Sequence, residues 1–142
     1  MSAEAQLNNH LVGIIANPVS ARDIRRVVTN ASNIQTSERV NIVMRLLSTL
    51  SACGVDDVMF MPDTSGITAA LLKNLERGAR LGQVLPQIHM VEMDVRSTVE
   101  DTLEATRAMQ RSGVRAIIVL GGDGTHRAVV SELLRGQERG LP

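Results

Sequence analysis

Residues 116–126 read AIIVLGGDGTH, and this stretch does the most to define the fold. The apolar run from Ala116 to Leu120 predicts a buried strand, because strands of a parallel sheet covered on both faces are apolar at nearly every position. Glycines then end the strand. Beyond them, an amphipathic helix is indicated by Val129, Val130, Leu133 and Leu134. The stretch therefore predicts one strand–turn–helix unit of an α/β protein.

The rest of the chain repeats this alternation. Short apolar runs predict three further strands, at Leu11–Ala16, Val58–Met61 and Ile88–Met93. Apolar residues at helical spacing predict helices that begin at Ser37, near Ile67 and at Val99, and that end near Gly54, Gly82 and Gly113. On the third of these, one face is expected to carry Val99, Leu103, Thr106 and Met109.

Two predictions concern the segment after the first strand: a short helix capped by Asp23, and a polar loop over residues 29–35. The alternation of strands and helices as a whole implies right-handed crossovers. It predicts a doubly wound α/β fold with a mostly parallel, Rossmann-like sheet.

Composition excludes several classes of protein. With 142 residues, 44% of them apolar, the chain is expected to form one globular domain. Fifteen basic and fifteen acidic side chains cancel, so no overall field draws the chain to nucleic acid or to a membrane surface. Phe60 is the one aromatic residue, which argues against a base-stacking surface. Cys53 is the one cysteine, and no apolar run is long enough for a secretory or membrane segment, so we expect a cytoplasmic location.

The glycine-rich turn has the features of a phosphate-binding loop. Gly121, Gly122 and Gly124 lack the Cβ atoms that would keep a polyphosphate away from the backbone, and the first N–H groups of the following helix favour an anion. Asp123 in this setting suggests either Mg²⁺ binding or acceptance of a proton, and the sequence leaves both roles open. Asp-Gly is also a common turn dipeptide. The position of the motif between a strand and a helix favours phosphate binding over a plain turn.

Two motifs together resemble a known superfamily. Gly121-Gly-Asp-Gly-Thr125 and Asn17-Pro-Val-Ser20 are similar to elements of NAD kinases, diacylglycerol and sphingosine kinases and 6-phosphofructokinases. Within that superfamily, residues 14–28 most resemble the ATP-NAD-kinase-like proteins grouped with the acetoin-catabolism X protein.

The resemblance implies an ATP- and Mg²⁺-dependent phosphotransferase, with NAD or a related hydroxyl compound as acceptor and NADP as the product from NAD. It implies that Asp123 is the essential carboxylate and that Asn17 and Ser20 lie beside the nucleotide. The residues implied to line the ATP phosphates are Gly121, Gly122, Gly124 and Thr125.

Arginines near both motifs are candidates for neutralising phosphate charge. Arg22 follows the Asn17–Ser20 segment and Arg127 follows the glycine motif, whereas Arg25 and Arg26 are expected to be solvated surface residues. Ala21 stands where the lipid kinases usually carry glycine. The first loop is therefore expected to approach phosphate less closely than in those enzymes.

The resemblance also implies a second, β-rich lobe that supplies much of the acceptor site. Residues 1–142 are expected to be the nucleotide-binding lobe of a longer protein. The isolated chain should then bind nucleotide weakly, transfer no phosphoryl group, and self-associate as a homo-oligomer through apolar surface exposed where the second lobe docks. Two other functions stay open: a non-catalytic nucleotide-binding regulator, and a lipid-kinase lobe, which the absence of a basic amphipathic helix disfavours.

Overall fold

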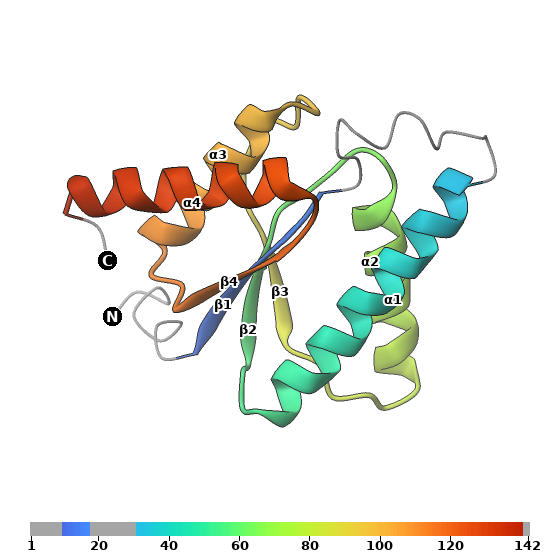
Figure 1. Ribbon diagram of the computed structural model, residues 1–142. Helices are drawn as coiled ribbons and strands as arrows, with labels where there is room; N and C mark the ends of the chain where they lie inside the picture. Colours follow the sequence, from blue (N-terminus) through green and yellow to red (C-terminus); the bar gives the residue numbers. More distant parts are fainter. Residues whose placement is uncertain (1–9, 18–30, 141–142) are drawn as a thin grey trace.

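The computed structural model describes residues 10–17 and 31–140 as four strands and four helices in strict alternation (Figure 1). In chain order they are β1 (Leu11–Ala16), α1 (Ala31–Ala52), β2 (Asp57–Phe60), α2 (Ile67–Arg80), β3 (Gln87–Met90), α3 (Val99–Arg111), β4 (Ala116–Leu120) and α4 (Asp123–Glu138). The helix expected after Asp23 lies outside the described residues. No described helix is both long and apolar enough to cross a bilayer.

The four strands form one parallel sheet in the order β3-β2-β1-β4. Ile14 in the middle of β1 pairs with Phe60 of β2 on one side and with Ile118 of β4 on the other. The chain thus moves outward from β1 to β3 and then returns to add β4 on the opposite side of β1. This topology confirms the predicted doubly wound α/β fold.

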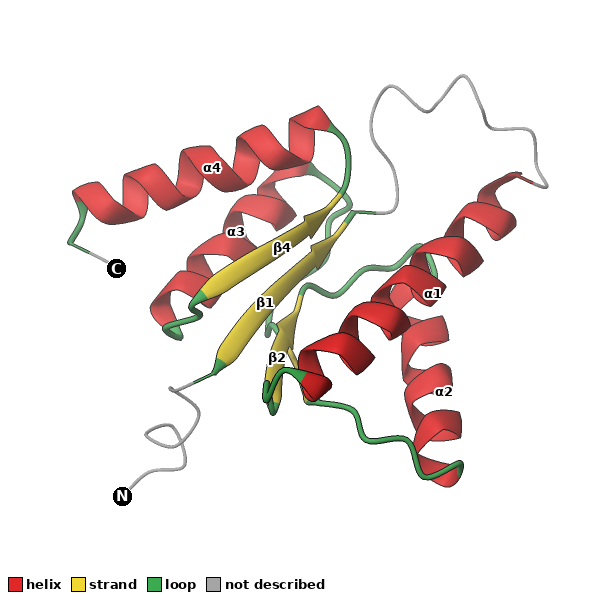
Figure 2. Ribbon diagram, turned by 60° about the horizontal axis from the view of Figure 1, so that its bottom comes forward, coloured by secondary structure: helices red, strands yellow, loops and turns green. Residues whose placement is uncertain are grey.

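Helices cover both faces of the sheet (Figure 2), with α1 and α2 on one face and α3 and α4 on the other. Every residue of β1 is buried, as predicted for a strand covered on both sides. On the α1/α2 face, the buried cluster contains Ile14, Ala16, Val40, Val43, Leu47, Val58, Phe60, Ile67 and Leu71. On the α3/α4 face, it contains Ile15, Met61, Val91, Ala105, Met109 and Val129.

β4 departs from the prediction of a buried strand. Ala116 is exposed and the other residues of β4 are only partly buried. The reason is its place in the sheet, because within the described residues β4 pairs with β1 alone. An apolar run indicates that both faces of a strand are covered, but it does not indicate whether both edges of the strand are paired.

Three other predictions were wrong in detail. α1 begins at Ala31, so residues 31–35 are helical where a loop was predicted. Ser32 and Asn33 disfavour a helix only slightly, and neither Gly nor Pro interrupts this stretch. β3 ends at Met90, three residues early, because β2 has already ended at Phe60 and offers no further pairing. On α3, Thr106 and Met109 are buried as predicted, but Val99 is 57% exposed, because the buried stripe of this helix begins at Asp101 and Thr102.

Candidate functional site

The loops after β1 and β4 meet at the carboxyl edge of the sheet. These two strands are neighbours in space although the chain visits two other strands between them, so their shared edge is the topological switch point where α/β sheets bind ligands. The N–H of Asn17 donates to the carbonyl oxygen of Leu120 over 2.9 Å, which extends the pairing of β1 and β4 by one residue. In Figure 2 the two arrowheads lie side by side below the start of α4.

A side-chain hydrogen bond joins the two predicted motifs. Nδ2 of Asn17 donates to Oγ1 of Thr125 over 3.0 Å, across 108 residues of sequence. Thr125 is buried, with 5% of its surface exposed. The structure therefore brings together Asn17 and the Gly121–Thr125 motif, and the bond between Asn17 and Thr125 ties the end of β1 to the first turn of α4.

The glycine motif is itself the start of a helix. Gly122 is the N-cap of α4, so Asp123, Gly124 and Thr125 form its first turn. The N–H groups of a first helical turn have no partner within the helix and carry partial positive charge, which favours an anion. Asp123 and Gly124 were predicted to lie in the loop before the helix, and the structure corrects this because both belong to α4. Their helical conformation fixes the direction of their N–H groups.

The glycines of the motif differ in their surroundings. A Cβ atom on Gly121 would lie 2.9 Å from both Cβ and Oγ1 of Thr125, so this glycine permits the packing of Thr125. A Cβ atom on Gly124 would meet no described atom within 4 Å. Packing against the described chain therefore explains the glycine at 121 and leaves the glycine at 124 unexplained.

Asp123 lies exposed at the first position of α4. No described residue forms a hydrogen bond or ion pair with its carboxylate, so the carboxylate is accessible to a metal ion or to a substrate hydroxyl. The described residues contain no group of three or more His, Cys, Asp or Glu side chains placed to hold a metal ion. A cation at Asp123 would thus take most of its ligands from a bound phosphate chain or from water.

The remaining predicted residues fall into two groups. Ser20, Arg22, Arg25 and Arg26 lie outside the described residues. Arg127 is exposed on α4. The neighbouring His126 is also exposed, and its Nδ1 lies 2.9 Å from the carbonyl oxygen of Gly122. His126 is therefore engaged with its own N-cap.

Of the other histidines, His10 is exposed, and Nε2 of His89 lies 2.8 Å from Oδ1 of Asp57. Asp57 opens β2, at the amino end of the strand, away from the candidate site. No local pattern predicts this pair, because the two residues belong to neighbouring strands whose register is visible only in the fold.

Arg39 of α1 reaches the same edge and was not predicted from the sequence. Its guanidinium donates to the carbonyl oxygen of Asn17, 22 residues earlier in the chain. Asn17 is thus contacted by α1 through its backbone and by α4 through its side chain. Nothing in the sequence distinguishes Arg39 from a solvated helix residue, because its contact with Asn17 depends on how α1 packs against the sheet.

The loop after β2 carries a strongly engaged carboxylate. Asp63 accepts hydrogen bonds from the N–H groups of Ser65, Ile67 and Thr68 and from the hydroxyls of Ser65 and Thr68. Burial alone raises the pKa of Asp63, but these hydrogen bonds to the ionised form outweigh burial and hold the pKa below its ordinary value. Asp63 therefore organises the start of α2.

The loop after β3 is held in a similar way from α3. The carboxylate of Asp101, 5% exposed, accepts hydrogen bonds from the N–H groups of Arg96 and Ser97. Ser97 adopts a positive φ of 60°, which is uncommon for a residue with a side chain. Its hydroxyl lies 3.3 Å from that of Thr64, so the loops after β2 and β3 touch.

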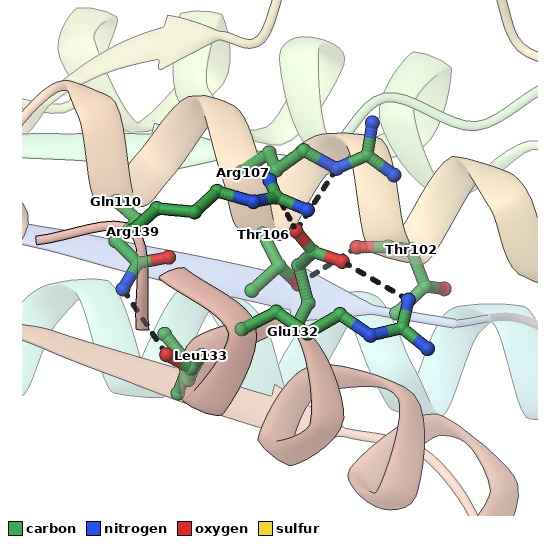
Figure 3. Close-up of polar contacts among 8 residues, drawn as sticks. Thr102, Thr106, Arg107, Gln110, Glu132, Leu133 and Arg139 are labelled. Carbon is green, nitrogen blue, oxygen red and sulfur yellow. Dashed lines mark hydrogen bonds and ion pairs between the residues drawn. The ribbon is translucent and has the colours of Figure 1, made fainter. Parts of the chain in front are cut away.

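An ion cluster around the buried Glu132 holds α4 against α3 (Figure 3). Glu132, 1% exposed, has its carboxylate 3.0 Å from Nε of Arg107 on α3 and 3.8 Å from both Arg135 and Arg139 at the end of its own helix. One turn of α3 further on, Nε2 of Gln110 donates to the carbonyl oxygen of Leu133 over 3.3 Å. These contacts fix the position of α4, and with it the position of the glycine motif at its start.

Comparison with known proteins identifies the family of the chain. Residues 12–138 match the family model described as ATP-NAD kinase N-terminal domain. Acetoin catabolism protein X from Cupriavidus necator is 55% identical over 122 residues, which are 86% of this chain and 34% of that protein. The chain thus spans about a third of the length of this relative. No solved structure matches the chain. Because the family model covers nearly the whole chain, from β1 to the end of α4, the chain belongs to the ATP-NAD kinase N-terminal domain family.

Proposed function

We propose that the chain is the ATP-binding lobe of a phosphotransferase that moves the γ-phosphoryl group of ATP to a hydroxyl of NAD or of a related compound. The observation that carries this proposal is the arrangement at the end of β1 and β4. A helix N-terminus opens on the switch point of the sheet, Gly124 there has no Cβ to obstruct a ligand, and Thr125 is anchored to Asn17.

The phosphate chain of ATP would lie against the first turn of α4. The backbone N–H groups of Asp123 and Gly124 would donate to phosphate oxygens, as N–H groups at helix starts do in other phosphate sites. The bond from Asn17 to Thr125 keeps this turn in place before the ligand arrives. The binding energy is then not spent on ordering the loop.

Asp123 has two roles open to it. Its exposed carboxylate can hold Mg²⁺, which when bound neutralises phosphate charge, or it can accept the proton that the acceptor hydroxyl loses as the new P–O bond forms. In either role the change Asp123→Asn removes the charge and keeps the shape. We expect turnover to fall about a hundredfold or more with the fold intact.

The acceptor site is proposed to lie largely in a β-rich second lobe of the longer protein. The test is therefore an acceptor screen on that longer protein, with Mg²⁺ and ATP and with NAD, NADH, diacylglycerol and sugar phosphates compared. NADP formation that is lost in Asp123→Asn would support the proposal. Nucleotide binding without turnover of any acceptor would instead support a regulatory module, and turnover of diacylglycerol alone would support a lipid kinase.

A further inference from the structure

We infer that Arg39 is a phosphate-binding residue of the nucleotide site, contributed by α1 from the opposite side of the sheet to α4. This inference deepens the proposed function and rests on it. Arg39 belongs to neither motif, and its place at the site becomes visible only in the fold, where its guanidinium reaches the residue that follows β1.

Two contacts define the position of Arg39. Its guanidinium donates to the backbone carbonyl of Asn17, the residue that follows β1 directly. The carboxamide of the same Asn17 donates to Thr125, in the first turn of α4. A guanidinium from α1 and the positive end of α4 therefore flank one residue at the switch point, approaching it from the two faces of the sheet.

The positive charge of Arg39 is not matched by a described carboxylate. Arg39 is half-buried, and among the described residues no carboxylate lies within ion-pair distance of it. Asp63, the acidic side chain of the loop after β2, is instead engaged by the start of α2. A guanidinium has five N–H donors, and a single carbonyl uses few of them. Withdrawing such a group from water without an anion is unfavourable, so the arrangement suits a site whose anion arrives with the ligand.

The chemistry of that ligand follows from the two flanking groups. Helix N–H groups and a guanidinium both prefer phosphate oxygens, and Arg can hold two of them at once. Placed on either side of Asn17, they suit an extended polyphosphate better than a single phosphate group. We therefore assign Arg39 to the phosphate chain of a nucleoside triphosphate and not to the adenosine.

The test compares Arg39→Gln and Arg39→Lys with Arg45→Gln as the matched control. Arg45 is an exposed arginine of the same helix, six residues away and directed to a different side. Calorimetric titration of the purified chain with Mg-ATP, tripolyphosphate and adenosine gives the affinities, and thermal unfolding checks the fold. We expect Arg39→Gln to weaken binding of Mg-ATP and tripolyphosphate at least tenfold, Arg39→Lys to weaken it less, and adenosine binding and the control to be unchanged.

The outcomes separate the inference from the proposed function. If the wild-type chain binds Mg-ATP and Arg39→Gln binds it equally well, Arg39 only caps the end of β1 and the inference is wrong. If the wild-type chain binds neither Mg-ATP nor tripolyphosphate, the proposed function fails together with the inference. Should Arg39→Gln not fold, modification of wild-type Arg39 by phenylglyoxal, followed by mass spectrometry, decides the matter: protection by tripolyphosphate supports the inference, and unchanged labelling overturns it.

Discussion

Alanine at Gly124 should weaken ligand binding without harming the fold, whereas alanine at Gly121 should destabilise the fold. At position 124 the new methyl group would meet no described atom within 4 Å, whereas at position 121 it would lie 2.9 Å from the Thr125 side chain. If Gly124 is glycine because phosphate lies against it, the cost of its replacement appears only when ligand is added. If Gly121 is glycine because of Thr125, the cost appears in the fold itself.

The magnitudes follow from these contacts. Gly124→Ala replaces glycine in the first turn of α4, where alanine reduces the freedom of the unfolded chain, and should raise the free energy of unfolding by about 0.5 kcal/mol. Gly121→Ala forces Thr125 to move and strains its hydrogen bond to Asn17. Overpacking and the weakened hydrogen bond should together lower the free energy of unfolding by about 2 kcal/mol. Mg-ATP binding should weaken at least tenfold in Gly124→Ala, because the methyl group would occupy the space of a phosphate oxygen.

Urea denaturation of both variants gives the stabilities, and calorimetric titration with Mg-ATP gives the affinities. Wild-type affinity in Gly124→Ala would refute the placement of phosphate at the first turn of α4. A loss of stability in Gly124→Ala equal to that in Gly121→Ala would show that the surroundings of the two glycines do not differ as described.

Two further predictions concern buried or half-buried carboxylates that stabilise the fold. Glu132→Gln keeps the shape of the side chain but removes the charge that Arg107, Arg135 and Arg139 share. Urea titration should show the free energy of unfolding lowered by about 2 kcal/mol. The control Glu138→Gln, at an exposed position of the same helix, should leave this free energy nearly unchanged. Asp63 has a lower pKa in the folded than in the unfolded chain. Its ionised form therefore stabilises the fold at pH values above the ordinary carboxyl pKa of about 4. This stabilisation is lost as the pH falls through the pKa of the folded state. Asp63→Asn should therefore be less stable than wild type at pH 7, with the difference shrinking below about pH 4; a constant difference across this range would contradict the assignment.

Local sequence patterns correctly predicted the alternation of strands and helices. They gave wrong predictions where burial is determined by contacts with elements distant in the sequence. β1 was identified because its apolar run is bounded by turn residues, and its burial on both faces followed. The same reasoning misjudged β4, since an edge strand and a central strand can both be apolar. Val99 was assigned to the buried face of α3 from periodicity, although the packing of α3 against α4 selects a stripe that includes the polar Thr102 and Gln110.

The candidate site was predictable to the extent that it lies in contiguous motifs. The Gly121–Thr125 motif was singled out by its glycines between a strand and a helix, and Asn17 by its resemblance to known kinases. The structure places the two in contact. Arg39 and Glu132 carry no local signal, because each acts through an element distant in sequence. An arginine or a glutamate on a helix is usually solvated, and only tertiary packing distinguishes these two from the rest.

The contacts that position α4 lie at two places along the helix. The first turn of α4 is positioned at its start by Asn17 and, seven residues further along the same helix, by the pairing of Glu132 with Arg107. A helix is stiff over two turns, so a change in the tilt of α4 at Glu132 moves the N–H groups that would contact phosphate by a comparable angle. Phosphoryl transfer depends on holding donor and acceptor in line, and small displacements are costly. If the chain is part of the longer phosphotransferase proposed above, substitutions at the α3–α4 contact should therefore alter its turnover more than they alter ATP affinity, although they touch no substrate.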